Sequence, residues 1–508
     1  MNTELHELEE QGCFKIVPLS TAAGKEIVDT LWALKRKRFP DGRLSRYKAW
    51  LVVRGDQQRA EFGRDATYAP VVEWSTVRLL LVLSLQHNLH TVSIDFKNAF
   101  VQASLPTPIY VRIPRGYGKG LEGSILEVHK SLYGDRRAPK LWYSFLRAHL
   151  ESTDLGFSVA SSDHCMFLRS DCILIHYVDD AILISRDMSV IDNILSKLEG
   201  RGLLYDRMAD LAAYLGVEII PHGPKSIELK QTHLTATIIE ALSLTDAHAK
   251  DTPASASLGK SPDSPPFDNV EFNYRSVIGM LIYLGGNSRM DCSFAIHQCA
   301  RFSADPRFIH AEAVKRIGRY LAGTKDKGFI LQPTKKMNLD CYVDADFAGL
   351  WGTEEAHDPT SVRSRAGFLL TLGGVPVTWV SKLMPEICLS TMEAEYVALS
   401  IAMRSLVPLR LKLQEVSTCL ALPMDPKSTV STVWEDNQAA LLLATTNPPR
   451  LTPRSKSLGV KFHWFRSKLI SGQIELQAIR SADQLADILT KPLARIQFVR
   501  ARMMCMGW

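Results

Sequence analysis

The sequence predicts a mixed α/β protein with two or three domains. Its 508 residues are enough for each domain to bury a core of its own. Short runs rich in β-branched residues, typical of strands, occur between leucine-rich stretches at helical spacing. Several of the strand-like runs end in aspartate, which indicates carboxylate chemistry at strand ends. A hydrophobic content of 46% and a charged content of 22% are those of an ordinary globular protein.

The overall composition limits the kinds of partner and compartment that the chain can have. A net charge of +6 permits a nucleic-acid partner without requiring one. Nine cysteines without C-x-x-C pairs favour neither a disulfide framework nor a zinc knuckle, so a reducing, intracellular setting is expected. The first ten residues are acidic and polar, unlike a signal peptide. The longest apolar stretch, residues 77–86, contains Arg78 and is too short to span a membrane, so no membrane association is expected.

The first elements along the chain are a helix-like start and a short apolar strand at residues 13–17. Residues 31–58 follow as a predicted β-hairpin, with a turn at Pro40-Asp41-Gly42. This hairpin has eight basic side chains from Lys35 to Arg54, a pattern that a solvated face would also explain. Leucine-rich residues 77–88 have the spacing of a core helix.

An aspartate pair between two apolar strands is the strongest chemical signal. Residues 173–185 read as a largely buried hairpin whose two arms flank Asp179 and Asp180. An ordinary polar turn is the alternative, but the Gly or Asn common in tight hairpins is absent. Two adjacent carboxylates repel each other and are costly to desolvate unless a cation offsets them, and Mg²⁺ prefers such oxygens. Upstream, Asp95 ends an alternating strand that could lie beside the pair.

Together these residues resemble a known family. Asp95 with Tyr177-Val178-Asp179-Asp180 is similar to the catalytic core of reverse transcriptases. The surrounding motifs resemble those of copia-type retrotransposon Pol polyproteins, and the resemblance covers nearly the whole chain. These motifs are Asp95-Phe96-Lys97-Asn98-Ala99-Phe100, Ser131-Leu132-Tyr133-Gly134 and Ala138-Pro139-Lys140-Leu141-Trp142-Tyr143.

The resemblance implies a right-hand polymerase followed by a ribonuclease H-like α/β domain. The expected boundaries are fingers and palm at 1–230, thumb and connection at 231–337 with a Pro/Ser-rich linker or loop at 251–269, nuclease at 338–495, and a tail at 496–508. It implies that two Mg²⁺ ions per active site, or Mn²⁺, are held in the palm by Asp95, Asp179 and Asp180. It further implies that Lys48, Arg54 and Arg137 contact the nucleotide's triphosphate, and that Phe100 is a steric gate against the 2′-hydroxyl.

A second set of carboxylates follows in the C-terminal third of the chain. Asp344 ends a strand, Glu393 and Glu395 lie on a predicted helix, Asp436 follows another strand, and Asp487 lies on a further predicted helix. This order is similar to ribonuclease H, in which four carboxylates hold two metal ions. Glu393 and Glu395 cannot both face Asp344, because they are about 200° apart around a helix; the family pattern favours Glu395 and leaves Glu393 as the alternative.

Basic residues near the predicted nuclease indicate a nucleic-acid edge or a solvated loop. They are Arg450, Arg454, Lys456 and Lys461, with His463 and Trp464 nearby. Helix 310–322 also has a basic face, which either follows a phosphate backbone or is solvated. The chain departs from the family pattern at Trp50, Asp135, Arg137, Met290 and Ser457.

The expected function is RNA-directed DNA synthesis combined with ribonuclease H (endonuclease) cleavage in a retrotransposon. The expected partners are an RNA template, a DNA primer, the RNA–DNA hybrid and deoxynucleoside triphosphates, in a cytoplasmic particle or the nucleus. The alternative is a decayed copy that binds nucleic acid with little or no polymerase activity, because of the departures named above. A host-adopted binding protein is disfavoured, since all expected catalytic carboxylates are present. The family's capsid, protease and integrase segments are absent, which fits a processed product, a gene-model fragment or a truncated insertion.

Overall fold

The structure is a computed structural model. It describes residues 1–38, 43–59, 61–117, 121–208, 211–334, 336–351, 361–424, 429–446, 458 and 462–508. The chain forms two compact units. The first contains residues 1–73, 89–211 and 419–421, and the second contains residues 74–88, 212–418 and 422–508.

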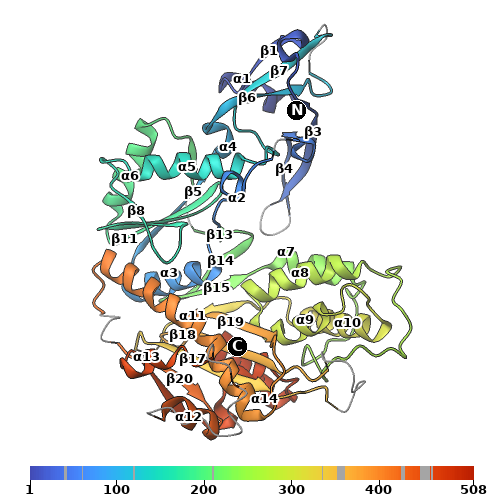
Figure 1. The fold of residues 1–508 in the computed structure, drawn as a ribbon, viewed down its shortest axis with the longest axis vertical. Coiled ribbons are helices and arrows are strands. Elements are labelled where there is room, and N and C mark those ends of the chain that lie inside the picture. The colour runs from blue at the N-terminus through green and yellow to red at the C-terminus, as the bar shows by residue number, and fades with distance from the viewer. Residues whose placement is uncertain are drawn as a thin grey trace. The chain divides into compact units, whose positions relative to one another are not determined.

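The first unit is built from three sheets and several helices (Figure 1). Its helices, with η for 3₁₀, are α1 (Asn2–Glu10), η1 (Leu19–Ala22), η2 (Gly55–Gln57), α2 (Arg64–Thr67), α4 (Ala99–Gln102), α5 (Ala138–Leu150) and α6 (Met188–Gly200). Its strands are β1 (Phe14–Pro18), β2 (Ile27–Val28), β3 (Thr30–Arg38), β4 (Leu44–Val53), β5 (His90–Phe96), β6 (Ser104–Arg112), β7 (Ser124–Lys130), β8 (Ser158–Val159), β9 (Met166–Arg169), β10 (Cys172–Tyr177), β11 (Asp180–Ser185) and β12 (Tyr205–Arg207).

The largest sheet of this unit has the order β12-β5-β11-β10-β9-β8, and helices α5 and α6 bury their apolar faces against it. Helix α5 begins with Pro139 in its first turn, where proline costs no hydrogen bond. Its buried residues Trp142, Leu146 and Leu150 recur at helical spacing and share a core with Ile194 of α6. The central strands are buried on both faces, which explains their continuous apolar sequence.

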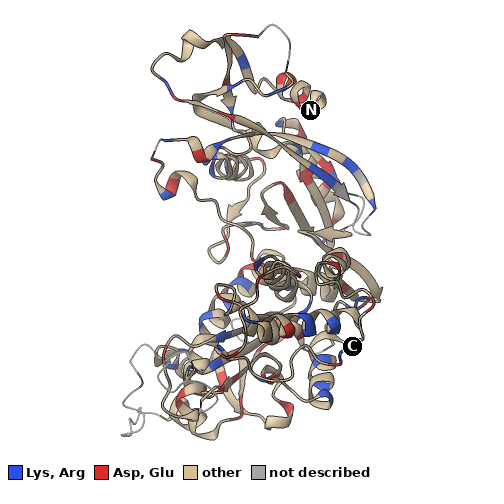
Figure 2. Ribbon diagram, turned by 90° about the vertical axis from the view of Figure 1, so that its right-hand side faces the viewer, with Lys and Arg blue, Asp and Glu red and all other residues tan. Residues whose placement is uncertain are grey.

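The basic hairpin forms as β3 and β4, which pair from Thr30↔Val53 through Lys35↔Lys48 and beyond. Lys and Arg recur along its strands (Figure 2). The predicted turn at residues 40–42 lies outside the described residues. The remaining sheet of the unit has the order β1-β7-β6-β2.

The second unit contains a four-stranded sheet, a helical region and a five-stranded sheet (Figure 1). Its helices are α3 (Trp74–His87), α7 (Thr232–Ala241), α8 (Tyr274–Asn287), η3 (Met290–Cys292), α9 (Ser293–Ala300), α10 (Phe308–Ala322), α11 (Thr391–Cys419), α12 (Gln438–Thr445), α13 (Arg466–Ile470), η5 (Ser481–Asp483), η6 (Leu485–Leu489) and α14 (Arg495–Met506). Its strands are β13 (Ala213–Tyr214), β14 (Val217–Gly223), β15 (Ser226–Lys230), β16 (Phe329–Leu331), β17 (Leu339–Asp346), β18 (Arg365–Leu372), β19 (Val375–Leu383), β20 (Ser431–Glu435) and β21 (Ile474–Ala478).

Helix α3 belongs to this second unit, although its sequence lies within the predicted polymerase region. Arg78 explains why. It is buried, it donates from Nε to the Val377 carbonyl at 2.8 Å, and its guanidinium lies 4.1 Å from the ring centroid of Trp379. Burial lowers the pKa of Arg78 to about 9. Because removing these partners would leave a buried cation, α3 is fixed to β19.

Residues 251–269, predicted as a linker or exposed loop, are held against the helices of the second unit. His310 of α10 contacts the Gly259 carbonyl through Nε2 at 2.7 Å, and the Gln298 side chain of α9 accepts from the Leu258 N–H at 3.1 Å. His310 is therefore buried and is not part of the basic face predicted for this helix. The predicted tail contains helix α14. Among the described residues, no helix combines the length and apolar character needed to cross a membrane.

Candidate active sites

The sheet of the first unit brings the three predicted palm aspartates to one place. Strand β11 pairs with β5 so that Asp180 lies opposite Asp95, and Tyr177 pairs with Asp180 across the intervening hairpin turn. Directly opposed residues of antiparallel strands project from the same face. Strand β12 adds Asp206 on the other side of Asp95, a carboxylate that the sequence analysis missed. Asp206 is ion-paired with Lys97 at 2.7 Å.

The turn between the two strands is strained and held from two sides. Val178 has a φ of +56°, a left-handed conformation that is unfavourable for a β-branched residue. Its carbonyl accepts a hydrogen bond from the indole Nε1 of the buried Trp142. The Asp179 carbonyl accepts from the Phe96 N–H at 2.7 Å. Helix α5 and strand β5 thus fix the backbone that presents the aspartate pair.

A cavity of about 610 Å³ lies in front of these residues. Asp95 and Asp179 line it together with Lys48, Trp50 and Tyr133. The Lys48 ammonium lies 5.0 Å from the Trp50 ring centroid, a cation–π distance. Burial, with Asp179 and then Asp95 among the contributing charges, raises the pKa of Tyr133, so this phenol stays protonated beside the carboxylates.

The position of Tyr133 depends on the glycine that follows it. Gly134 has a φ of +89°, and a Cβ atom there would lie 2.0 Å from the Val53 carbonyl oxygen. The Tyr133 carbonyl accepts from the Val53 N–H at 2.7 Å, so the loop lies directly against β4. Only glycine combines that backbone conformation with so close an approach.

Of the three residues predicted to contact the triphosphate, one lines this cavity. Lys48 lines the cavity, whereas Arg54 and Arg137 do not. Arg54 is ion-paired with Asp56 at 2.6 Å on the surface. Arg137 is buried in an ion pair with Asp135 at 3.0 Å. In this structure the guanidinium of Arg137 supports its own loop and does not face the carboxylates.

The predicted steric gate also lies outside the lining of this cavity. Phe100 is partly buried and packs edge-to-face on Tyr133, with ring centroids 4.9 Å apart. Phe100 therefore contacts Tyr133, which lines the cavity together with Asp95 and Asp179. Its expected action on the sugar would pass through Tyr133.

Helix α1 adds acidic side chains to the same cavity. Glu4 and Glu7 line it, and Asn98 donates to the Glu7 carboxylate at 3.3 Å. Burial raises the pKa of Glu4, and the nearby Lys48 opposes this shift. The sequence pattern of this helix indicates no chemistry, since its residues match only an ordinary helical start.

In the second unit, three predicted nuclease carboxylates meet. Strands β17 and β20 are parallel with Tyr342 opposite Trp434, so Asp344 and Asp436, each two residues further on, reach the same level. Glu395 approaches from helix α11. Carboxylate oxygens of Asp344, Glu395 and Asp436 all lie within 4.8 Å of one another. Asp95, Asp179 and Asp180 do not form so tight a cluster in this structure.

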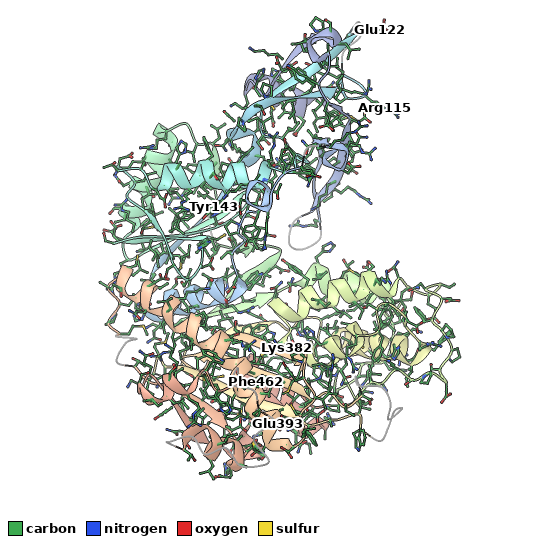
Figure 3. All side chains as sticks on the ribbon, in the orientation of Figure 1. Arg115, Glu122, Tyr143, Lys382, Glu393 and Phe462 are labelled. Atoms are coloured by element: carbon green, nitrogen blue, oxygen red, sulfur yellow. The ribbon has the colours of Figure 1, made fainter. Side chains whose placement is uncertain are left out.

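The structure separates the two candidate glutamates on α11. Glu393, labelled in Figure 3, lies in the first turn and accepts from the Leu389 N–H at 2.8 Å. Glu395 reaches Asp344 instead. Its Oε2 atom is buried and has no hydrogen-bond partner among the described residues, and the same holds for Oε2 of Glu435. Buried carboxylate oxygens without donors are what a divalent cation would satisfy, so these residues fit Mg²⁺.

Asp487 joins this cluster through a lysine. Asp487 lies on the 3₁₀ helix η6 and not on the predicted α-helix. The Lys491 ammonium lies 3.0 Å from Asp344 Oδ1 and 2.8 Å from Asp487 Oδ1, and Thr490 donates to the other Asp344 oxygen. The sequence analysis did not assign Lys491, Thr490 or Glu435. Only the position of Lys491 four residues after Asp487 could have indicated a shared site.

The charges explain the protonation of this cluster. Burial, followed by repulsion from Glu435 and Asp344, raises the pKa of Glu395 well above its usual range. Burial followed by Asp344 also raises the pKa of Asp487. For Lys491, burial alone would lower the pKa, but Asp344 and Asp487 outweigh it and raise the pKa.

The predicted nucleic-acid edge is described only in part. Arg450, Arg454, Lys456, Ser457 and Lys461 lie outside the described residues. His463 and Trp464 are anchored on helix α11. His463 Nδ1 lies 2.8 Å from the Tyr396 hydroxyl, and Trp464 Nε1 donates to Ser400 at 3.1 Å.

Comparison with known proteins shows which family part of the chain matches. Residues 13–256 match the family described as reverse transcriptase (RNA-dependent DNA polymerase). The chain is 30% identical over 477 residues to the "Retrovirus-related Pol polyprotein from transposon RE2" of Arabidopsis thaliana, covering 93% of the chain and 31% of the relative. It is 30% identical over 514 residues to that from transposon TNT 1-94 of Nicotiana tabacum, covering 98% and 37%.

A more distant relative is the Transposon Ty1-H Gag-Pol polyprotein of Saccharomyces cerevisiae, which is 24% identical over 494 residues, covering 92% of the chain and 26% of the relative. The chain spans about a third of the length of the plant relatives. A solved foamy viral protease-reverse transcriptase in complex with double-stranded DNA aligns with a TM-score of 0.45 and 13% identity, covering 93% of this chain and 68% of that one. Residues 13–256 therefore match a reverse transcriptase family, and more than nine-tenths of the chain is similar to Pol polyproteins of transposons.

Proposed function

We propose that the chain is an RNA-directed DNA polymerase that also cleaves the RNA strand of RNA–DNA hybrids. The observation that supports polymerisation best is the register that places Asp180 opposite Asp95, on strands next to a cavity lined by Asp179 and Lys48. The tight cluster of Asp344, Glu395 and Asp436 supports the nuclease activity.

In the polymerase site, Asp95, Asp179 and Asp180 would hold two Mg²⁺ ions, or Mn²⁺, which supply Lewis-acid activation of the primer hydroxyl and charge neutralisation on the triphosphate. Lys48 would bind the triphosphate as a point charge. Tyr133 forms a neutral wall beside the carboxylates, and Trp142 keeps the strained turn in place. These contacts give the reaction a fixed geometry without reading the base sequence.

In the nuclease site, Asp344, Glu395, Asp436 and Asp487 would hold two such ions for in-line hydrolysis of a phosphodiester. Asp344 belongs both to the carboxylate cluster and to the ion pair with Lys491. Ser481 fixes one oxygen of Asp436 by a hydrogen bond of 2.6 Å. The substrates would be the RNA template, the DNA primer, deoxynucleoside triphosphates and the hybrid, recognised through backbone and duplex shape.

The test is primer extension on an RNA template and hybrid cleavage, both measured with the purified chain and Mg²⁺. Asp179→Asn should abolish extension and leave cleavage intact, and Asp436→Asn should do the reverse. Two matched controls, Asp192→Asn in an exposed ion pair with Arg207 and Glu393→Gln outside the cluster, should retain both activities. One substitution that silences both activities would contradict the two-site proposal.

A specific observation favours a second candidate, a copy that has lost polymerase activity. Trp50 lines the cavity where the family pattern has arginine, and Arg137 is engaged with Asp135. A chain that cleaves the hybrid and binds primer–template but extends no primer would establish this alternative.

A further inference from the structure

A cavity in the second unit combines three cations with one acid that is already neutralised. The cavity has a volume of about 390 Å³ and is lined by residues of α9, of α10 and of the loop at 250–258. Figure 1 shows where α9 and α10 lie. Lys250, Arg316 and Arg319 line it, and the single acidic residue of its lining is Glu312. Neither of the two candidate active sites uses these residues.

The cations of this cavity lack the acidic partners that other cations of α10 have. Lys315, on the same helix, is ion-paired with both Glu271 and Glu312. Arg316 has a neutral partner, because its Nη2 donates to the Thr252 hydroxyl at 2.9 Å. Its Nε is buried without a hydrogen-bond partner among the described residues. The side chains of Lys250 and Arg319 form no ion pair within the described part of the chain.

The wall opposite these cations is fixed in place. Thr252 donates to the Ala254 carbonyl at 2.9 Å, and Arg301 donates to the Leu258 carbonyl at 3.3 Å. The Lys250 N–H also donates to the Arg319 carbonyl at 3.4 Å, which joins the loop to α10. Three like charges held by a fixed frame repel one another unless an anion lies between them.

The chemistry of the lining selects the kind of anion. Two guanidinium groups and an ammonium match the oxygens of a phosphate, since guanidinium donors pair with such oxygens in a fixed geometry. The lining also contains Ala295, Ile309 and Ala313, which could accept the apolar edge of a sugar, and contacts to phosphate and sugar carry no sequence information. We propose that this cavity binds one backbone phosphate of a nucleic-acid duplex, independently of sequence. The choice of a phosphodiester over a free phosphate compound rests on the proposed function.

The salt dependence of binding tests this site. Fluorescence anisotropy would measure the affinity of the full chain for a labelled RNA–DNA hybrid across a KCl series. Arg319→Gln should make the slope of log affinity against log salt shallower by about 0.9, the change expected for one lost phosphate contact. Lys327→Gln, which removes an exposed cation that is ion-paired with Asp326 outside this cavity, should leave the slope unchanged. An unchanged slope for Arg319→Gln would overturn the proposal.

Two further arms separate the remaining explanations. Arg319→Lys keeps the charge and should keep the slope; if Arg319→Lys and Arg319→Gln both change it alike, the residue is structural and the proposal fails. If Arg319→Gln instead weakens binding of free tripolyphosphate and leaves hybrid binding intact, the site takes a free anion. The Asp179→Asn chain should show the wild-type slope. A lack of primer extension with an intact slope would therefore refute the polymerase activity but not this site.

Discussion

His176 makes the first unit sensitive to acid. It lies on β10, which leads into the aspartate pair, and both ring nitrogens are buried without hydrogen-bond partners among the described residues. It stacks on Tyr143, with ring centroids 5.7 Å apart, and the ring centroid of Phe167 also lies 5.7 Å away. Burial lowers the pKa of His176 to about 4, and the charge of Asp163 opposes this only in part.

The sign of the effect follows from proton binding. The unfolded histidine has a pKa of about 6.5, so between about pH 6.5 and pH 4 the unfolded state binds more protons than the folded state. The stability linked to the neutral His176 side chain is therefore fully present above about pH 6.5, and it is lost as the pH decreases toward 4. The difference of about 2.5 pKa units corresponds to a maximum of about 3 kcal/mol, of which about 2 kcal/mol is lost between about pH 7 and pH 5.

The measurement compares the wild-type chain with His176→Phe, which retains an aromatic ring between Tyr143 and Phe167. Urea unfolding of both chains would be measured at about pH 7 and pH 5, and hydrogen exchange of peptides from β10 and β11 would monitor the unfolding of this region. The substitution should reduce the pH-dependent loss by about 2 kcal/mol. His90→Gln, at an exposed histidine of strand β5, should leave this pH-dependent loss unchanged. Equal pH-dependent losses in the wild-type and His176→Phe chains would refute the reasoning.

Four other substitutions test the sites. Lys491→Met should lower the free energy of unfolding of the metal-free chain by about 2 kcal/mol, a value reduced because the lysine is partly exposed. Added Mg²⁺ should restore the stability of this variant in urea titrations. If Mg²⁺ does not restore it, the ammonium and the metal ion do not occupy the same position. Trp50→Arg should lower the KM for nucleotide in primer extension. Arg137→Gln should lower the free energy of unfolding, measured by urea titration, by about 3 kcal/mol, because it leaves Asp135 buried and unpaired. Val178→Gly should relieve about 1 kcal/mol of strain yet slow DNA synthesis, and an unchanged rate would argue that the strained turn has no catalytic role.

The sequence predicted those parts of the fold in which local pattern and burial agree. Residues 173–185 form the expected hairpin because two apolar runs of strand length can be buried only as paired strands. The resemblance to ribonuclease H supplied the order Asp344, Glu395, Asp436, and helix periodicity showed that Glu393 and Glu395 cannot both face Asp344.

What the sequence could not supply depends on contacts between distant segments. Arg137 looked available for a triphosphate until the structure placed it against Asp135 in a buried pair. Helix α3 belongs with the second unit because Arg78 finds its acceptors some 200 and 300 positions further along the chain. Lys491 carries no local sign that its ammonium contacts Asp344. Side-chain partners of this kind follow from tertiary packing, which periodicity does not encode.

Lys491, in the proposed nuclease cluster, also allows folding and metal binding to occur as separate events. Where a metal alone neutralises buried ligands, the apoprotein does not fold, and metal loading and folding are one step. Here the Lys491 ammonium, carried by the chain itself, already balances Asp344 and Asp487. The unit can therefore complete its fold first and load ions later. On the proposed nuclease function, a chelator would stop hydrolysis and leave the architecture standing, so that activity would follow the supply of divalent ions while the lifetime of the folded unit would not.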